Sequence, residues 1–327
     1  MVTKIVDAIH NKSGINQRGL IEKDLILHKI LLELSSNPYF KENYAFKGGT
    51  CLIKCYFGYY RFSEDMDFTF KNKGIFENKS EKQIRRIISK EIDKLAKLLD
   101  KTCQKLNLEF KPEKSNKEYF EFRAGNKFTT IKMYYHSPEL NKKTFIKLQI
   151  NFLEDLIFEC KNKKAKSLRW EGYNETELKF ILPEGSGWFF QSPEISCYDL
   201  KEILCEKIRA ILTRQGVKSR DFIDVYLITK NQGLSLKSLK KEVVKKISSM
   251  LKYEKYLDNL KGHMQEIPTF KIGEEEKLLI GKLGKDFHKF LEKFNEFLKE
   301  IITEIENEHR GNSSSQQKSL KSRKESD

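Results

Sequence analysis

Two aspartates one residue apart are the side chains of this sequence best suited to chemistry. Asp65 and Asp67 lie in the segment RFSEDMDF (61–68), whose alternation fits a β-strand. Alternate side chains of a strand share a face, so both carboxylates should point the same way. They repel each other, and a divalent cation bound between them relieves the repulsion. Because Mg²⁺ held by one or two carboxylates and substrate phosphates is usual at phosphoryl-transfer sites, we predict that both aspartates are catalytic ligands of Mg²⁺ or Mn²⁺.

A pair of glycines upstream could bind the phosphates. The residues Lys47, Gly48, Gly49 and Thr50 lead into a predicted helix at 51–57. Glycines let the backbone approach a phosphate closely, and the N–H groups at a helix start favour an anion. Thr50 would cap this helix and add a hydroxyl donor. A lone glycine pair usually marks only a turn, and a lone Asp-x-Asp is usually a solvated strand face, but their succession is a much stronger signal.

The elements that must position these residues follow from the periodicity of the sequence. Helical spacing of apolar residues predicts a helix over 20–35, and the capping box of Ser80 and Gln83 opens a second one. Segments rich in Phe, Tyr, Ile and Thr predict strands of one mostly antiparallel or mixed sheet, at 63–70, 107–111, 118–124, 127–135 and 144–153. On the strand at 63–70, Met66, Phe68 and Phe70 should face a core.

The composition changes at residues 182–196, which hold two prolines and two glycines. Downstream, apolar spacing predicts helices over 198–213, from about residue 220, and over 287–305. We therefore expect an α+β protein with three parts, namely a domain on a small mixed sheet (1–190), a helical bundle (191–310) and a disordered tail rich in Ser, Gln and Lys (311–327).

The charge balance predicts a negatively charged partner. The chain has 62 Lys and Arg against 47 Asp and Glu, a net charge of +15, which favours nucleic acid first and an anionic membrane surface second. The stretch KNKKAKSLRW (161–170) has no acid, so it could hold an RNA backbone while Trp170 stacks on a base. The alternative is that this charge run is a solvated loop.

Several classes of protein are disfavoured. Six cysteines without a C-x-x-C pair predict reduced, mostly buried thiols rather than a disulfide scaffold or a zinc ribbon. The N-terminus lacks the apolar segment of a secretory signal, and no apolar stretch is long enough to span a bilayer, so we expect a cytoplasmic protein without a membrane partner. The P-loop and protein-kinase motifs are missing.

A second group of charged residues lies in the predicted helices after residue 198. Lys207 falls within the apolar stripe of its helix, where burial is costly unless a negative partner is near, and Arg214 follows seven residues later. Asp221 and Asp224 share a face of the next helix. An antiparallel pair of helices would bring Lys207 opposite both carboxylates. One interpretation is a buried structural salt bridge between two helices.

The order of glycine turn, short helix and Asp-x-Asp strand resembles the signature of the nucleotidyltransferase superfamily built on the DNA polymerase beta fold. More specifically, KGGTCL with RFSEDMDF, and EKIRAILTRQGVKSRDFIDVY at 206–226, resemble the AbiEii group of bacterial nucleotidyltransferase toxins. The similarity runs with interruptions from about Lys23 to Tyr226. It implies a polymerase-beta-like domain that transfers a nucleotidyl group from an NTP to an acceptor. The acceptor would be RNA, such as the tRNA 3′ end, and the protein would be a toxin neutralised by an antitoxin.

The resemblance also implies roles for the second group. Lys207 would contact nucleotide phosphates together with the glycine turn, with Arg214 nearby. An aspartate of the second helix would serve the active site. Asp224 is preferred because it lies amid Phe222, Ile223 and Tyr226, where an unpaired carboxylate is unwelcome, and Asp221 is the alternative.

One departure from the superfamily pattern concerns the strand IKLQINF. Members commonly place a third carboxylate on a later strand, where this chain has Gln149, which cannot carry a negative charge. The third acid would then be Asp155 or the helical Asp224, or two carboxylates suffice. A catalytically degenerate nucleotide- or nucleic-acid-binding module is the competing function, and a metal-dependent nuclease is a third.

Three further residues complete the predicted nucleotide site. Arg61 and Ser63 would orient the Asp-x-Asp strand or touch phosphate. Lys147 shares a strand face with Gln149 and would contact phosphate, although an exposed strand lysine without a role is as plausible.

Overall fold

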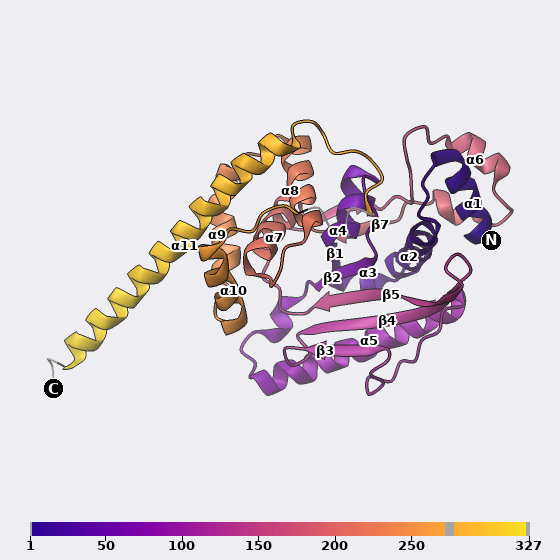
Figure 1. Ribbon diagram of the computed structural model, residues 1–327. Coiled ribbons are helices and arrows are strands. Elements are labelled where there is room, and N and C mark those ends of the chain that lie inside the picture. Colours follow the sequence, from indigo (N-terminus) through magenta and orange to yellow (C-terminus); the bar gives the residue numbers. More distant parts are fainter. Residues whose placement is uncertain (1, 272–277, 325–327) are drawn as a thin grey trace. The chain divides into compact units, whose positions relative to one another are not determined.

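The computed structural model describes residues 2–271 and 278–324 of the chain (Figure 1). Contacts divide it into two compact units. The sheet unit comprises Met1–Asp199 and Leu278–Gly281, and the helical unit comprises Leu200–Lys277 and Lys282–Asp327. No helix in the described residues is long and apolar enough to cross a membrane.

A seven-stranded mixed sheet forms the centre of the sheet unit, which agrees with the predicted α+β class. Its strands are β1 (Tyr44–Lys47), β2 (Asp65–Phe70), β3 (Phe120–Arg123), β4 (Phe128–Ser137), β5 (Lys142–Asn151), β6 (Lys161–Lys164) and β7 (Glu194–Cys197). Their order across the sheet is β3-β4-β5-β2-β1-β7-β6. The pairs β2–β5 and β1–β7 are parallel and the other pairs are antiparallel. β2 therefore lies in the interior of the sheet, between β1 and β5.

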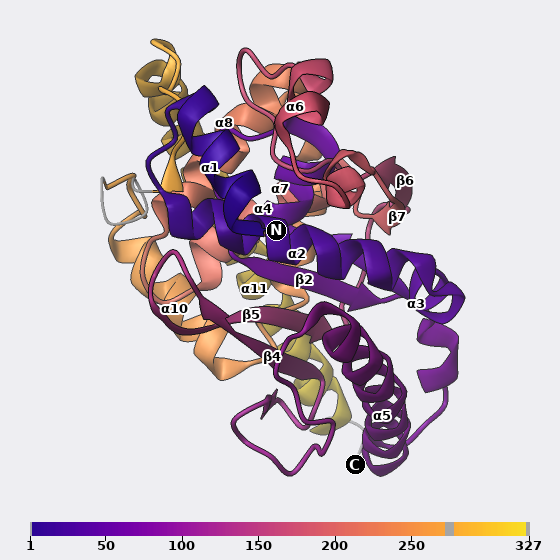
Figure 2. The same ribbon diagram turned by 90° about the vertical axis from the view of Figure 1, so that its right-hand side faces the viewer.

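The helices of the sheet unit are α1 (Val2–Ser13), α2 (Arg18–Ser36), α3 (Pro38–Asn43), α4 (Gly48–Cys51), α5 (Glu81–Leu106) and α6 (Glu175–Ile181). A π-helical turn (Leu52–Phe57) continues α4, and 3₁₀ turns occupy Lys73–Phe76 and Ser186–Phe190. Figure 2 shows α5 beside β4, and its apolar stripe is buried. The capping box of Ser80 and Gln83 opens α5, as predicted, whereas α1 was not predicted. α2 and α5 contact each other, and Lys105 of α5 pairs with Glu33 of α2.

The structure corrects one expectation for the sheet. Residues 107–111 form only one bridge, Glu109 to Tyr134, because Asn107 ends α5 in a left-handed conformation and Pro112 soon follows. β7 lies within the region 182–196, and the chain leaves the sheet unit after Asp199. Lys161–Lys164 of the basic stretch form β6, a short and exposed edge strand that pairs with β7.

The helical unit contains α7 (Leu200–Thr213), α8 (Ser219–Gln232), α9 (Lys240–Ser248), α10 (Glu254–Gln265) and α11 (Phe287–Lys324), with a 3₁₀ turn at Leu236–Leu239. The helices predicted at 198–213, from 220 and over 287–305 are confirmed as α7, α8 and α11. The backbone of 311–324 continues α11 where composition predicts disorder, since no proline interrupts a helix started by the buried residues before it. Residues 325–327 of that tail lie outside the described residues. The division into domains at 1–190 and 191–310 stays a prediction.

Candidate active site

Asp65 and Asp67 lie on one face of β2, as the alternation predicts. Both are half-buried, whereas Met66 and Phe68 between and after them are fully buried on the opposite face. The two carboxylates thus lie two residues apart on an interior strand of the sheet. They occupy the face opposite to the one on which Met66 and Phe68 are buried.

The glycine turn lies against the second carboxylate. Lys47 pairs with Asp67 in the β1–β2 register, so the turn that follows β1 begins directly beside Asp67. Gly48 has φ +77°, and a Cβ atom there would lie 2.5 Å from Asp67 Oδ2. A Cβ atom on Gly49 would collide with the guanidinium of Arg61 and lie 3.1 Å from Ser63 Oγ. Gly48 is therefore favoured by its positive φ, and at both Gly48 and Gly49 a side chain would collide with a neighbouring residue.

Thr50 contacts the aspartate strand rather than standing open to a ligand. Its side chain is buried, and Oγ1 hydrogen-bonds to the backbone carbonyl of Asp65 at 2.5 Å and to Ser63 Oγ at 2.8 Å. The predicted helix cap at Thr50 is wrong, because Lys47 is the N-cap and the helix already begins at Gly48. Thr50 and Ser63 therefore fix the start of β2 against α4.

Arg61 is a buried cation beside the same turn. Nη1 donates a hydrogen bond to the backbone carbonyl of Phe62 at 2.8 Å, and the guanidinium lies 5.6 Å from the ring centroid of Tyr60. The segment Leu278–Gly281 borders this stretch, since Phe62 N donates to Leu278 O at 2.7 Å. These are the contacts of a residue that orients the glycine turn and the entry to β2, one of the two roles predicted for Arg61.

β5 supplies the neighbours of both aspartates. In its parallel register with β2, Lys147 lies beside Asp65 and Gln149 beside Asp67. Gln149 thus occupies the place where a third carboxylate was expected, and its Nε2 lies 3.4 Å from Thr130 Oγ1. β4 places Lys132 beside Lys147, a cation that sequence reasoning missed because the hairpin register was not assigned.

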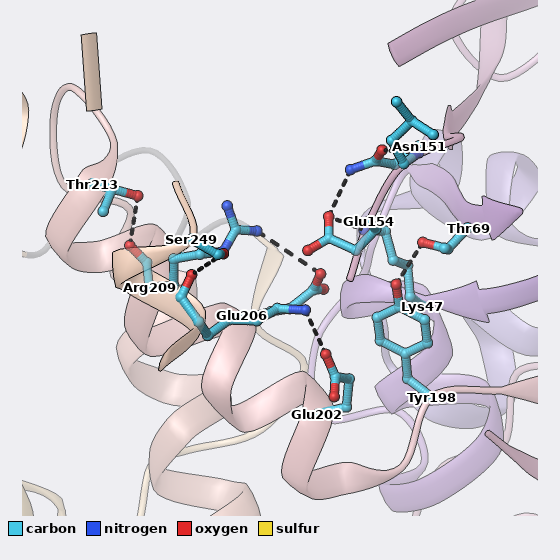
Figure 3. Close-up of polar contacts among 12 residues, drawn as sticks. Lys47, Thr69, Asn151, Glu154, Tyr198, Glu202, Glu206, Arg209, Thr213 and Ser249 are labelled. Carbon is cyan, nitrogen blue, oxygen red and sulfur yellow. Dashed lines mark hydrogen bonds and ion pairs between the residues drawn. The ribbon is translucent and has the colours of Figure 1, made fainter. Parts of the chain in front are cut away.

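Lys47 is held by an acid that sequence reasoning also missed (Figure 3). Its Nζ lies 3.5 Å from Glu154 Oε2 and 5.4 Å from the ring centroid of Tyr198. Asn151 Nδ2 donates to the same Glu154 oxygen at 2.6 Å, and Glu154 is buried. The sequence reasoning considered only the adjacent Asp155. No local pattern indicates this contact, because Lys47 and Glu154 are 107 residues apart in the sequence.

The predicted charged group of the helical unit forms between α7 and α8. Lys207 Nζ lies 2.7 Å from Asp221 Oδ1 and 2.7 Å from Asp224 Oδ2. Arg214 Nη1 lies 2.8 Å from Asp221 Oδ2. The side chains of both aspartates are almost inaccessible, whereas that of Arg214 is 42% exposed. Burial by itself raises the pKa of Asp221, but the charges of Lys207 and Arg214 outweigh it and hold the pKa below its usual value.

Neighbouring residues of α7 carry further ion pairs (Figure 3). Glu202 accepts a hydrogen bond from Lys246 Nζ of α9 at 2.5 Å, with both side chains buried. Glu206 pairs with Arg209 at 3.8 Å within α7. The buried Glu202–Lys246 pair shows that this unit uses charged pairs between helices as part of its packing.

Replacing Lys207 by methionine should destabilise the protein by about 3–5 kcal/mol, because two buried aspartates lose their shared partner. The pKa of Asp221 is lower in the folded protein than in the unfolded chain, where an aspartate has a pKa of about 3.9. The ion pair therefore stabilises the fold fully above the unfolded-state pKa, and this contribution is lost as the pH falls through the folded-state pKa. The cost of Lys207→Met should therefore be largest at neutral pH and shrink in acid, where the carboxylates gain protons. Denaturant unfolding at pH 7 and below pH 4 measures the destabilisation by Lys207→Met and its decrease in acid. The comparison variant is Arg214→Met, which should cost about 1 kcal/mol. A cost of Lys207→Met no larger than that of Arg214→Met would contradict the structural role.

The basic stretch at 161–170 divides between two environments. Lys161–Lys164 form the exposed strand β6, while Trp170 is half-buried and packs edge-on against Tyr173, with ring centroids 5.1 Å apart. Trp170 thus contributes to an apolar cluster, which favours the structural interpretation of this side chain.

Comparison with known proteins decides the family. The AbiEii family model, described as the nucleotidyl transferase AbiEii toxin of a type IV toxin–antitoxin system, matches residues 29–310. The chain belongs to the AbiEii family. It is therefore a nucleotidyltransferase of a toxin family, which confirms the resemblance seen in the sequence, and membership implies a nucleotide substrate and an antitoxin counterpart.

Two solved structures from Helicobacter pylori are similar to this AbiEii chain over most of their length. JHP933 is 16% identical with a TM-score of 0.41, over 91% of this chain and 98% of that chain. The other, whose description assigns it provisionally to the nucleotidyltransferases, is 15% identical with a TM-score of 0.41, over 88% and 97%. No match was found among curated proteins.

Proposed function

We propose that this AbiEii protein transfers a nucleotidyl group from an NTP to RNA, such as the tRNA 3′ end, as a toxin controlled by an antitoxin. The observation that carries the proposal is the pair Asp65 and Asp67 on one face of β2, with the backbone of Gly48 packed against Asp67. The net charge of +15 supports a polyanionic acceptor.

The donor atoms at this place suit a hard divalent cation. Asp65 and Asp67 offer carboxylate oxygens, and Gln149 beside Asp67 offers a neutral amide oxygen. Mg²⁺ usually keeps several waters and binds one or two carboxylates plus substrate phosphates, so glutamine in place of a third acid is compatible with binding. Mg²⁺ or Mn²⁺, when bound by Asp65 and Asp67, supplies charge neutralisation at the reacting phosphate.

In this proposal, the other residues of the sheet unit bind the triphosphate or hold the aspartate strand in position. The backbone of Gly48 and Gly49 approaches the triphosphate, and Lys147 with Lys132 supplies positive charge beside Asp65. Thr50, Ser63 and Arg61 hold β2 and the glycine turn in place. Lys47 is anchored by Glu154 at the end of β1 and adds a cation at the turn.

The proposal includes the charged group of the helical unit. Arg214 and Lys207 are its phosphate contacts, and Arg214 is the more accessible of the two. Asp221 and Asp224 hold these cations, and Asp224, or Asp221 in its place, is the acid that serves the active site. The family resemblance supports these roles, and the ion pairs supply the preorganised geometry.

The test combines the full-length protein, Mg²⁺, each labelled NTP separately and total bacterial tRNA. With one of the NTPs, label is expected to enter the RNA and the RNA to become longer. The variant Asp65→Asn/Asp67→Asn should transfer no label. Shortened RNA would indicate a metal-dependent nuclease instead. Magnesium-dependent NTP binding without transfer of label from any NTP would contradict the proposal and favour a binding module.

A further inference from the structure

Three cysteines converge next to the glycine turn. The Sγ atoms of Cys51, Cys55 and Cys197 all lie within 4.8 Å of one another. This is the one group of three or more potential metal ligands of the types His, Cys, Asp and Glu found in the described residues. The six cysteines are free thiols, as predicted, but no pattern in the sequence indicates that three of them meet.

The topology of the sheet unit explains the convergence. β1 pairs with β7 in parallel, which places Phe46 beside Cys197. The chain then turns at Gly48 into α4, so Cys51 at the end of α4 returns toward the same strand pair. Cys55 follows four residues later in the π-helical turn Leu52–Phe57. π-helical turns inside helices often mark functional sites.

The surroundings of the three sulfurs favour a cation. Cys51 and Cys197 are fully buried, while Cys55 is half-buried. The pKa of Cys197 is lowered to about 4, because the thiols of Cys51 and Cys55 hydrogen-bond to its sulfur, with help from the charge of Lys163. The three sulfurs therefore converge in a mostly buried setting, which is the arrangement that a cation with a preference for thiolates requires.

We propose that Cys51, Cys55 and Cys197 bind one soft d¹⁰ cation, Zn²⁺ or Cu⁺, through three thiolates. Thiolates select such ions, whereas the carboxylates of β2 prefer Mg²⁺. A Zn–S bond of about 2.3 Å puts the sulfurs of one site about 3.8–4.0 Å apart, so small side-chain rotations complete the site. A disulfide would need about 2.05 Å and would leave one thiol unused. On binding, each coordinating S–H group releases its proton to solvent, and no oxidant is required.

The bound ion would tie together segments that position the active site. Cys51 immediately follows Thr50, and Cys197 precedes Tyr198, whose hydroxyl hydrogen-bonds to Thr69 of β2 at 2.5 Å. A cation shared by α4, the π-helical turn and β7 therefore stabilises the glycine turn against β1 and β7. Stability and thiol protection, measured without substrate, report this role independently of nucleotidyl transfer.

The experiment uses the full-length protein, reduced, freed of reductant under anaerobic conditions and saturated with Mg²⁺. Separate arms add Zn²⁺, Cu⁺, or Cd²⁺ as a spectroscopic probe with an ultraviolet thiolate charge-transfer band. One equivalent should bind, protect three cysteines from a thiol reagent, release protons and raise the melting temperature. The Zn²⁺ and Cu⁺ arms establish which ion binds more tightly.

Matched variants make the outcome decisive. Cys55→Ser should weaken binding at least about 100-fold, whereas Cys160→Ser, another half-buried cysteine outside the cluster, should bind as the wild type does. Asp65→Asn/Asp67→Asn should also retain the soft cation. The proposal is overturned if no arm produces thiol protection in the wild type, or if Cys55→Ser, folded by circular dichroism, binds equally well. Loss of binding in the aspartate variant would also overturn it, since the ion would then be held by the carboxylates.

Discussion

Replacing either Asp65 or Asp67 by asparagine should lower the rate of nucleotidyl transfer by at least about 10²–10³-fold without unfolding the protein. Asparagine keeps the shape of aspartate and removes the charge that a divalent cation requires. Both residues are half-buried on a face of β2 whose opposite side carries the core, so the substitution leaves packing unchanged. Steady-state transfer of labelled nucleotide measures the effect.

The same substitutions should leave stability unchanged or increase it when no divalent cation is present. Two like charges two residues apart on one strand face repel, and each substitution removes that repulsion. Mg²⁺ should raise the melting temperature of the wild type and have little effect on either variant. Thermal unfolding with and without Mg²⁺ measures both effects.

Glu64 provides the matched control for the aspartates. It precedes Asp65, is 42% exposed and pairs with Lys23 at 2.8 Å, outside the proposed site. Glu64→Gln should preserve both the rate and the response to Mg²⁺. A transfer rate for Asp67→Asn within tenfold of the wild type would remove the carboxylate pair from the proposed mechanism.

Alanine at Gly48 should reduce transfer by about 10²-fold, the size of effect that a misplacement of about 1 Å produces at a reacting centre. The new Cβ atom would lie 2.5 Å from Asp67 Oδ2, so the carboxylate must move away. Alanine at φ +77° also costs about 1–2 kcal/mol of stability, whatever surrounds it. Transfer rates and unfolding free energies separate the two effects.

Gly58 offers a control with the same positive φ. It also has φ +77°, but a Cβ atom there meets nothing within 4 Å. Gly58→Ala should therefore lose similar stability and keep its transfer rate. If Gly48→Ala acts through Asp67, adding it to Asp67→Asn should cost little more activity than Asp67→Asn alone. Equal rates for Gly48→Ala and Gly58→Ala would rule out the contact with Asp67 as the cause.

Periodic features of this protein could be predicted from the sequence because they depend on local geometry. The alternation of β2 identifies the shared face of Asp65 and Asp67, and helical spacing identifies the meeting of Lys207 with Asp221 and Asp224. Gln149 was identified from the resemblance to the superfamily pattern, and β5 places it beside Asp67.

Features that depend on distant partners were missed. Lys161–Lys164 contain no apolar residue, so nothing local indicates a strand, and pairing with β7 alone makes them one. The cysteine cluster joins residues near 50 to residue 197 through the β1–β7 pair, which no local pattern reveals. Thr50 has the chemistry of a cap, but the left-handed Gly48 starts the helix earlier.

The sheet order also governs when this enzyme can become active during its own synthesis. Asp67 is synthesised before Gln149, its neighbour in β5. β1 is likewise synthesised before Cys197 of β7, the strand with which it pairs. Until those strands emerge, β1 and β2 form at most a two-stranded hairpin, which is marginally stable in water. Pairing of residues so far apart is also intrinsically slow. A nascent chain that has not yet reached Cys197 therefore has no assembled site, so a member of a toxin family gains its activity only after β7 has been made.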